Sequence, residues 1–506
     1  MLLRLGTRRS LLAWAQSSWV ARSLEERRPG LRVELIGIDT RGDQVLDISL
    51  QKMEGKEFFV AELDEALRAR RVDFSVHSLK DLSLDRPSDF VMGAIPEREN
   101  PRDVILWGPG LIEKIASGRV LRVGTSSPRR LENIPAFLSR ALPRVGEKRA
   151  DVHFVEIRGN VNTRLARVHE VVGSERALDG VVLAFAGLSR LWNDRAGREE
   201  LEKLFVGVRW MVLPLRENPT APGQGALAVE CRADDVGTRE ILRALHHEPS
   251  ERTVARERAV LAQYGGGCHQ KFGASNTAHE ELGEVFFVRG RKSNGELIAQ
   301  DDDVSIEFTV SSKDLVISKY TEVESVSSAV GNAQAVFVAH SRALSFDVEA
   351  KSFLSTKRVY VSGAQTWFKL AEQGIYVEGS AESLGLSFLQ PTLNAPVLQL
   401  PERLKWVALT HHDAAKTWHD LEIPARATYS VVYSEAPGAE EKLKKARGVF
   451  WHSAGHGEVF KSNASIKTVT HGCGAGKTRE NLKSLGLQAK SFLNEQEFEK
   501  WLTHRI

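Results

Sequence analysis

The sequence is poor in cysteine, since its 506 residues include only three: Cys231, Cys268 and Cys473. An odd number of widely spaced cysteines argues against a disulfide framework and favours a reducing compartment. No apolar run approaches the roughly 18 residues that a membrane-spanning helix needs. The formal net charge is only +3, from 69 basic and 66 acidic residues, so no global field indicates a nucleic-acid or membrane binder. Any anion-binding site must therefore be local.

A pair of arginines near the start, in Thr7-Arg8-Arg9-Ser10, superficially resembles a twin-arginine export signal. Residues 13–19, which follow, are too polar for the apolar core of such a signal and suit an amphipathic helix better. We therefore expect a soluble cytoplasmic protein, and we expect it to be a monomer.

Strands and helices alternate along the first half of the chain. The pattern predicts strands at 2–6 and 32–39 and helices at 10–28 and 58–70. Such alternation is typical of a mostly parallel α/β sheet. With 506 residues, the chain is long enough for about three or four domains.

Basic turns follow several predicted strands. They contain Arg8 and Ser10, then Arg129 and Arg130 after 120–124, Arg158 and Arg164 after 154–157, and Arg190 after 180–185. Free backbone N–H groups and guanidinium groups together favour anions. Four such turns suggest a cleft for a ligand that carries many carboxylates. Phosphate is the rival ligand, but neither a P-loop nor a dinucleotide fingerprint occurs in this half.

Polar residues also follow a predicted buried strand at 72–76, in the order His77, Ser78, Lys80 and Asp81. Residues just past the carboxyl end of such a strand are where α/β folds bind ligands. On another interpretation, Lys80 and Asp81 are an adjacent solvated pair and His77 is a satisfied polar residue at the strand end.

Three consecutive glycines, at 265–267, directly precede Cys268. They favour an unusual loop conformation or the close approach of a bulky group. Cys268 is then either a buried small hydrophobe, as many free cysteines are, or a thiol held at a loop tip for covalent chemistry.

A turn-rich connector at 219–225 predicts the start of another domain. A strand at 226–231 follows it, and we expect a hairpin of 284–291 and 296–301 across Ser293-Asn294-Gly295.

Eight motifs, taken in order, resemble the porphobilinogen deaminase (hydroxymethylbilane synthase) family over about residues 2–303. They are Thr7-Arg8, Thr40-Arg41-Gly42-Asp43, Val76-His77-Ser78-Leu79-Lys80-Asp81, Glu97-Arg98-Glu99-Asn100-Pro101-Arg102-Asp103, Gly124-Thr125-Ser126-Ser127-Pro128-Arg129-Arg130, Arg158-Gly159-Asn160, Pro222-Gly223-Gln224-Gly225 and Gly266-Gly267-Cys268. The resemblance implies three α/β domains: 1–97, to which 207–217 returns; 98–206; and 218–305, which carries the cysteine. The first two would resemble periplasmic ligand-binding proteins.

The resemblance also implies the chemistry. Cys268 would carry a covalent dipyrromethane cofactor, on which four porphobilinogen molecules condense head to tail with loss of ammonia. Asp81 would stabilise the positive charge that develops as ammonia leaves, and Lys80 and Arg8 would also be catalytic. The cofactor-binding residues would be Arg129, Arg130, Arg164, Ser78, Lys80, Thr125 and Ser127. The substrate-binding residues would be Arg8, Ser10, Arg158, Arg190, Lys56 and Phe59. No metal is implied.

The sequence departs from the family pattern at four positions. Glu54 and Glu57 replace glycines of the active-site loop, and Lys271 and Ser83 replace prolines. None of these changes removes a chemical group, so we expect activity. The rival hypothesis for the whole chain is a non-catalytic anion-binding protein.

Residues 306–506 contain an internal repeat. The segments 335–341 and 358–374 are echoed by 448–453 and 468–486, which predicts a bilobed α/β module. Together with Tyr433 in a strand, this region loosely resembles uroporphyrinogen-III synthase, in which such a tyrosine would assist departure of the substrate's hydroxyl. A degenerate scaffold, with Tyr433 packed as an ordinary strand residue, is the alternative.

The segment 472–478, Gly-Cys-Gly-Ala-Gly-Lys-Thr, is a near miss for a P-loop, because His471 stands where the first glycine is required. The corresponding segment of the first repeat, 362–366, has no lysine. We therefore do not expect nucleotide binding, although the turn could hold a carboxylate at a helix N-terminus.

Overall fold

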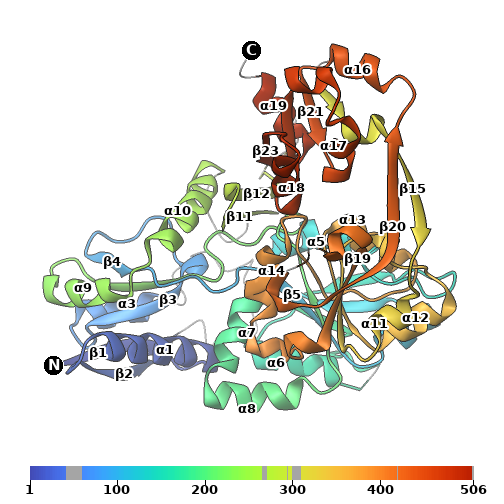
Figure 1. Ribbon diagram of the computed structural model, residues 1–506. Helices are drawn as coiled ribbons and strands as arrows, with labels where there is room; N and C mark the ends of the chain where they lie inside the picture. The colour runs from blue at the N-terminus through green and yellow to red at the C-terminus, as the bar shows by residue number, and fades with distance from the viewer. Residues whose placement is uncertain are drawn as a thin grey trace. The chain divides into compact units, whose positions relative to one another are not determined.

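The computed structural model describes residues 1–40, 60–171, 173–264, 271–292, 294–298, 309–416, 418 and 420–503 (Figure 1). The chain divides into two compact units. The first comprises Met1–Asn276, Phe286–Ile298 and Ala395–Gln399, and the second comprises Thr277–Val285, Ala299–Asn394 and Leu400–Ile506. Both contain α/β sheets. No helix in the described ranges is long and apolar enough to cross a membrane.

The first sheet of the first unit has the order β2-β1-β3-β10-β4. Its strands are β1 (Leu2–Arg8), β2 (Arg32–Ile38), β3 (Phe74–Ser78), β4 (Phe90–Ala94) and β10 (Leu227–Arg232). β1 is parallel to β2 and β3, whereas β10 is antiparallel to β3 and β4. Helix α1 (Leu11–Arg27) contributes Val20 and Leu24 to the core beneath this sheet, and α3 (Ala61–Arg68) contributes Leu63 and Leu67 to an adjoining core.

The second sheet has the order β7-β6-β8-β5-β9. Its strands are β5 (Asp103–Trp107), β6 (Leu121–Gly124), β7 (Val152–Val155), β8 (Gly180–Ala184) and β9 (Arg209–Val212), and its helices are α4 (Leu111–Ser117), α5 (Pro128–Ala141), α6 (Val161–Ala166), α7 (Phe185–Trp192) and α8 (Arg195–Leu204). β6 is parallel to β7 and β8, and β5 is antiparallel to β8 and β9. Helix α5 begins with Pro128, which suits a first helical position because its missing N–H needs no partner there.

Two strands lie in sheets other than those expected. The sequence assigned 207–217 to the first domain, but β9 pairs with β5 in the second sheet. It assigned 226–231 to a third domain, but β10 lies inside the first sheet. Both strands are short and apolar, and such a pattern indicates burial without indicating which neighbour the strand pairs with. Both sheets are consequently mixed rather than mostly parallel.

The rest of the first unit includes α9 (Val236–Leu242), α10 (Glu248–Gln263) and the sheet β11-β12-β13. These strands are β11 (Lys271–His279), β12 (Gly283–Arg291) and β13 (Leu297–Ile298). Gly290 pairs with Ile298 in an antiparallel register, so the predicted hairpin is confirmed over its described residues.

The second unit contains two larger sheets, ordered β15-β20-β19-β16-β17-β18 and β14-β21-β22-β23. The strands are β14 (Thr309–Ser311), β15 (Val316–Glu322), β16 (Ala335–Val338), β17 (Arg358–Val361), β18 (Gly379–Ser380), β19 (Trp406–His411), β20 (Ala425–Glu435), β21 (Gly448–Trp451), β22 (Thr470–Gly474) and β23 (Ala489–Phe492). The helices are α11 (Val326–Val330), α12 (Val348–Ser355), α13 (Ala364–Glu372), α14 (Leu386–Leu393), α15 (His412–Lys416), α16 (Ala439–Lys445), α17 (Ala454–Phe460), α18 (Lys477–Ser484) and α19 (Glu495–Thr503).

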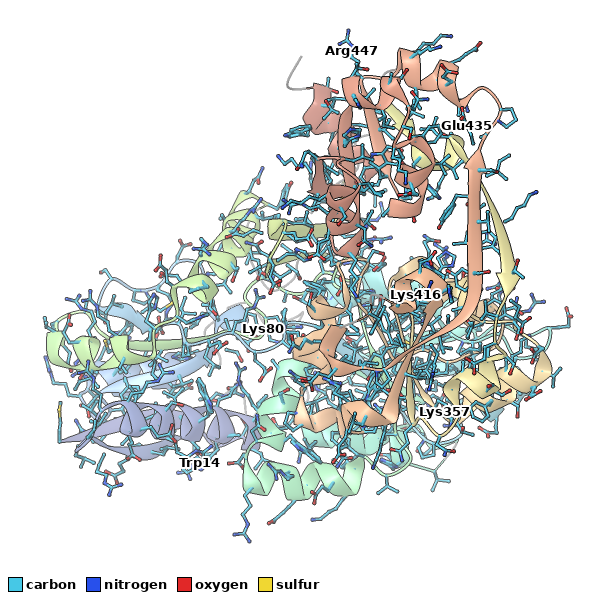
Figure 2. All side chains as sticks on the ribbon, in the orientation of Figure 1. Trp14, Lys80, Lys357, Lys416, Glu435 and Arg447 are labelled. Atoms are coloured by element: carbon cyan, nitrogen blue, oxygen red, sulfur yellow. The ribbon has the colours of Figure 1, made fainter. Side chains whose placement is uncertain are left out.

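The repeat is visible in this second unit. β16 and β17 are parallel and precede α13, just as β21 and β22 are parallel and precede α18. β15 and β20 run side by side as an antiparallel pair that ends where Val316 faces Glu435 (Figures 1 and 2).

Candidate active site

The end of β1 leads directly into α1. Arg8 is the last residue of β1, and the Ser10 side chain accepts a hydrogen bond from the Ala13 N–H at 3.3 Å, which caps the helix. Ser10 therefore has a structural task in addition to its predicted contact with substrate.

His77 lies buried in β3, where its Nε2 is 2.9 Å from Ser75 Oγ. Burial, with smaller contributions from the positive charges of Arg86 and Arg8, lowers the pKa of His77 to about 3. Glu230 lies 3.5 Å away, but Arg86 binds both of its carboxylate oxygens. A neutral imidazole with a hydroxyl partner fits a satisfied polar residue rather than an acid–base catalyst.

Lys80 and Asp81 lie on a short 3-10 turn, Leu79–Asp81, directly after β3. Asp81 is exposed, whereas half-buried Lys80, labelled in Figure 2, donates a hydrogen bond to Gln224. The Lys80 Nζ and Gln224 Oε1 atoms are 3.3 Å apart. Burial lowers the pKa of Lys80, and the negative charge of Asp81 opposes that shift. The two adjacent residues therefore have different environments, unlike a simple solvated pair.

Asp103, fully buried at the start of β5, organises the arginines of α5. Its Oδ2 accepts from Arg129 Nη1 at 2.8 Å, and its Oδ1 accepts from Arg130 Nη2 at 2.7 Å. Gln224 Nε2 donates to the same Oδ1 at 2.9 Å. Burial alone would raise the pKa of Asp103, but the two guanidinium groups lower it below its ordinary value. Gln224 thereby links the Lys80 amine to the Asp103 carboxylate.

The two guanidinium groups retain unused donors. The Nε atoms of Arg129 and Arg130 are buried and have no hydrogen-bond partner within the described ranges. Buried donors normally find a partner. Two unpaired N–H groups on adjacent cations, near the Lys80 amine, therefore fit a bound group that carries carboxylates.

Arg164 and Arg190 add buried positive charge. Arg164 Nε donates to Gly159 O at 2.7 Å, and Arg190 Nη2 donates to Gly225 O at 2.6 Å. Burial lowers the pKa of each to about 10, so both stay charged at neutral pH. The charges of Arg130 and Arg158 contribute to the lowered pKa of Arg164, and the charge of Asp81 opposes it, so these four charged groups lie close enough to interact.

The predicted hydroxyl residues lie at the same strand ends. Thr125 is buried, and its Oγ1 accepts from the Ser127 N–H at 3.3 Å, next to the start of α5. Ser78 Oγ accepts from Gln16 Nε2 at 3.4 Å. The fold thus brings together Lys80, Arg129, Arg130 and Arg164 with Thr125 and Ser127.

Comparison with known proteins bears directly on this site. Residues 3–240 match the family model described as "Porphobilinogen deaminase, dipyromethane cofactor binding domain". The porphobilinogen deaminase of Brevibacillus brevis is 38% identical over 278 residues, which cover 55% of this chain and 80% of that protein. The chain belongs to the porphobilinogen deaminase family. Members of this family are transferases of porphyrin and heme biosynthesis, and dipyrromethane is their cofactor.

Two further porphobilinogen deaminases agree. That of Shouchella clausii is 39% identical over 286 residues, covering 56% of this chain and 82% of that protein. That of Syntrophobacter fumaroxidans is 40% identical over 274 residues, covering 54% and 78%. Among solved structures, the methionine-binding protein MetQ is 12% identical with a TM-score of 0.27, and the match covers 50% of this chain and 94% of that one. That likeness is too low to bear on the fold.

Several predicted deaminase residues lie outside the described ranges. They are Cys268, Lys56 and Phe59, together with the departures Glu54 and Glu57. No role was predicted for Asp103 or Gln224, although both belong to the motifs quoted above. No local signal pointed to Asp103, because Arg129 stands 26 residues later in the chain and the two side chains meet only in the folded structure.

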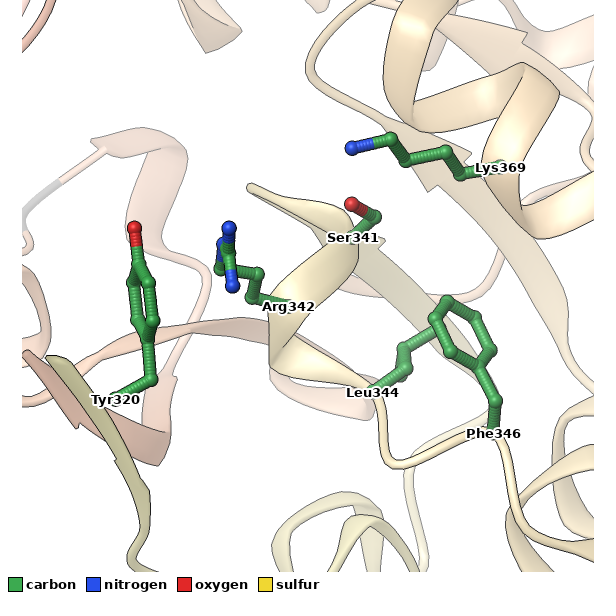
Figure 3. Close-up of a pocket in the computed structure, with 6 residues that line it drawn as sticks. All are labelled: Tyr320, Ser341, Arg342, Leu344, Phe346 and Lys369. Atoms are coloured by element: carbon green, nitrogen blue, oxygen red, sulfur yellow. The ribbon is translucent and has the colours of Figure 1, made fainter. Parts of the chain in front are cut away.

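The second unit has a separate cavity of about 410 Å³, lined by Tyr320, Ser341, Arg342, Leu344, Phe346 and Lys369 (Figure 3). The Arg342 guanidinium lies over the Tyr320 ring, 3.7 Å from its centroid, and Lys369 extends from α13 toward Ser341. Tyr429 of β20 packs against Tyr320 with ring centroids 6.1 Å apart. The cavity therefore combines two cations with an aromatic wall.

Tyr433 lies four residues further along β20. Its hydroxyl is 3.4 Å from Ser453 Oγ, and its ring packs edge-on against His456 at 5.0 Å. Burial raises its pKa. A side chain on Gly455 would meet this ring at 2.2 Å, so the glycine is required for the close packing. Tyr433 also belongs to the margin of a hydrophobic core.

No group of three or more His, Cys, Asp or Glu side chains that could hold a metal occurs among the residues the structure describes.

Proposed function

We propose that the chain is a hydroxymethylbilane synthase that condenses four porphobilinogen molecules head to tail. Each addition forms a carbon–carbon bond and releases one ammonia, and water finally releases the linear tetrapyrrole. The observation that carries the proposal is the buried Asp103–Arg129–Arg130 cluster with its two unpaired Nε donors, in a chain of this family.

Arg129, Arg130 and Arg164 would hold the carboxylates of the dipyrromethane group, with Lys80, Ser78, Thr125 and Ser127 beside them. That group supplies the carbon nucleophile to which each new pyrrole is joined. Asp103 binds both arginines of α5 at 2.7–2.8 Å, and so orients their remaining donors before any ligand arrives. Preorganised donors of this kind bind without a reorganisation cost.

Asp81 would carry the catalytic charge. Loss of ammonia from the aminomethyl arm of porphobilinogen leaves a cation, and a nearby carboxylate stabilises that developing charge. Asp81 is exposed, and its negative charge raises the pKa of both Lys80 and Arg164. Its carboxylate therefore lies near both cations. Arg8, Ser10, Arg158 and Arg190 would face the incoming substrate's acetate and propionate, with Lys56 and Phe59 from the active-site loop.

Intact-mass spectrometry of the purified full chain tests the assignment of Cys268 as the anchor. We expect wild type to be heavier than its sequence by a dipyrromethane, and we expect Cys268→Ser to lack that mass and to form no tetrapyrrole. Cys231→Ser is the matched control, because Cys231 is buried within β10 and burial raises its pKa to about 11. A wild type with no adduct and no tetrapyrrole product would instead support a non-catalytic anion-binding protein.

A second candidate function concerns residues 306–506. We propose that this module closes the linear tetrapyrrole into the asymmetric ring, as a uroporphyrinogen-III synthase does. The cavity that holds Arg342 and Lys369 favours it, because the substrate carries eight carboxylates and the aromatic wall suits a pyrrole face. Tyr433 would assist the departing hydroxyl.

The isomer formed from porphobilinogen by the intact chain tests this second candidate. We expect mainly the asymmetric isomer from wild type and from the exposed-site control Lys405→Ala, and mainly the symmetric isomer from an Arg342→Ala, Lys369→Ala double variant. If wild type itself yields only the symmetric isomer, the module is a non-catalytic scaffold.

A further inference from the structure

The near-miss P-loop turn at 472–478 already holds an anion, and that anion belongs to the chain itself. Gly476 N–H donates to Glu281 Oε1 at 2.9 Å, and Ser491 Oγ donates to Glu281 Oε2 at 2.8 Å. Gly476 is the residue before α18 and has φ +93°, which favours glycine. Because each carboxylate oxygen has its own donor, the turn and β23 together form a receptor for one carboxylate.

This receptor consists of more than a helix N-terminus, because the Ser491 hydroxyl of β23 also donates to the carboxylate. Ser491 is only 8% exposed, so its hydroxyl has little access to water in place of Glu281. Cys473 lies beside it, and burial raises the pKa of its thiol to about 11; the Glu281 charge contributes to this rise and the Ser491 hydroxyl opposes it. The carboxylate is thus bound close to a neutral thiol, a hydroxyl and a helix N-terminus, a combination that favours one negative charge.

Glu281 lies at the tip of the β11–β12 hairpin, between His279 and Gly283. His279 Nδ1 accepts from the backbone N–H groups of Glu281 at 3.1 Å and Leu282 at 3.3 Å. A neutral imidazole that accepts at Nδ1 carries its proton on Nε2, and Nε2 lies 2.9 Å from Leu384 O. His279 therefore stabilises the turn at the hairpin tip through Nδ1 and donates a hydrogen bond from Nε2 to the Leu384 carbonyl.

That second segment lies beside the other sheet of this unit. Leu384 falls between β18 and α14, and the His279 ring lies 6.1 Å from the ring of Phe388 on α14. The tip therefore contacts the six-stranded sheet's connections through His279 and the four-stranded sheet through Glu281. The two receiving turns also adjoin, since a side chain on Gly476 would lie 4.0 Å from Gly385 Cα.

We propose that the hairpin tip, residues 277–285, is an intramolecular docking element that bridges the two sheets of the second unit through the Gly476–Ser491 carboxylate receptor and the Leu384 carbonyl. The tip acts as a strap, because each of its two polar side chains binds a segment beside a different sheet. This role is separate from the proposed chemistry of the first unit, so it stands or fails independently of that chemistry.

Hydrogen exchange of the full chain tests the proposal. Glu281→Ala removes two hydrogen bonds to a charged group, so we expect exchange at 476–480 to rise by about ten- to a hundredfold. Glu281 and His279 belong to the same short hairpin tip, so releasing Glu281 should also loosen the contact between His279 and Leu384. Exchange at 384–388 should therefore rise as well. The matched control is Glu280→Ala, an exposed neighbour, which should leave both segments at wild-type rates.

Ser491→Ala probes the receptor from the opposite side, and combining it with Glu281→Ala gives a double-mutant cycle. We expect each single change to raise exchange at 476–480, and the double variant to exceed Glu281→Ala by little, because the two groups share one interaction. Two results would overturn the bridge: equal exchange in Glu281→Ala and Glu280→Ala, or a rise confined to 476–480 with 384–388 unchanged.

Discussion

Two carboxylates, Asp103 in the first unit and Glu281 in the second, each bind a cluster of donors, but their environments differ. Asp103 has 0% of its surface exposed and accepts from two guanidinium groups and the Gln224 amide. Glu281 is half-buried and accepts from one backbone N–H and one hydroxyl. A fully buried charge cannot leave its partners without a large desolvation penalty, whereas a half-buried one can exchange its donors for water. Asp103 therefore behaves as permanent framework and Glu281 as a reversible contact.

The arginines in the two units differ in the same way. Arg129 and Arg130 are buried and have their side chains directed by Asp103. Arg342 lines an open cavity and packs on the Tyr320 ring. A site whose cations are held by protein carboxylates is rigid before its ligand binds, and one whose cation rests on an aromatic ring can still adjust. The first arrangement suits a permanently bound group, and the second suits a passing substrate.

The largest effect should come from Asp103→Asn. Loss of the carboxylate leaves two buried guanidinium groups without their counter-charge, and breaking a buried pair in this way typically costs about 3–5 kcal/mol. Urea denaturation of the full chain should show the first unit unfolding at lower denaturant. Asp85→Asn, at an exposed position, is the control and should leave the midpoint unchanged. If the two variants have the same urea midpoint, the Asp103 carboxylate does not stabilise the first unit through the buried arginines.

Asp81→Ala should spare stability and reduce turnover. Asp81 is exposed, so little packing is lost, but its charge no longer stabilises the cation formed as ammonia departs. By analogy with the removal of one electrostatic stabiliser, kcat should fall by about 10²–10³-fold, with KM nearly unchanged. Steady-state porphobilinogen consumption measures both constants, and Asp85→Ala serves as the control. A rise in KM with kcat unchanged would assign Asp81 to substrate binding instead, and wild-type values of both constants would refute any role for Asp81.

The sequence indicated polar and basic turns after predicted strands, and turns of this kind do follow β1, β3, β6 and β7. Lys80 follows a strand of the first sheet, whereas Arg129 and Arg164 follow strands of the second, so a single sheet edge does not explain why these side chains lie close together. The strand at 209–212 lies in the second sheet instead of the first domain, and the strand at 227–232 lies in the first sheet instead of a third domain. Pairing partners depend on long-range packing that a local apolar pattern does not encode. Asp103 was missed for the same reason, since its burial between two arginines is visible only in three dimensions.

The Glu281 contact also shows that sequence alone does not reveal which distant residues meet. The sequence allows the turn at 472–478 to hold a carboxylate at a helix N-terminus, but it does not indicate that Glu281, 195 residues before Gly476, supplies that carboxylate. A local sequence pattern indicates where backbone N–H groups can bind an anion. Which carboxylate binds there depends on how the rest of the chain folds.

The pH dependence of stability tests whether burial lowers the pKa of His77 in the folded protein. Its folded pKa is about 3, while an unfolded histidine has about 6.5. Between these values the unfolded state binds a proton that the folded state does not, so the free energy of unfolding should fall as pH decreases, by about 1.4 kcal/mol per pH unit. His77→Gln removes this titration, and urea midpoints between pH 6.5 and 4.5 should then fall less steeply than in wild type. Parallel slopes for the two proteins would show that His77 titrates normally in the folded state.

Tyr433→Phe should give the smallest change in stability and therefore separates packing from chemistry. The hydroxyl lies 3.4 Å from Ser453 Oγ, at the long end of hydrogen-bond distances, so its loss should lower the free energy of unfolding by no more than about 1 kcal/mol. The ring, which packs on Gly455 and His456, is kept. Tyr433→Ala is the contrasting variant and should lower the free energy of unfolding by about 3 kcal/mol or more, because it leaves a cavity.

If Tyr433→Phe folds like wild type and yet forms the symmetric isomer, the hydroxyl acts in ring closure. If it forms the wild-type isomer, Tyr433 packs as an ordinary strand residue, and the chemistry of the second unit must lie with the cations of its cavity.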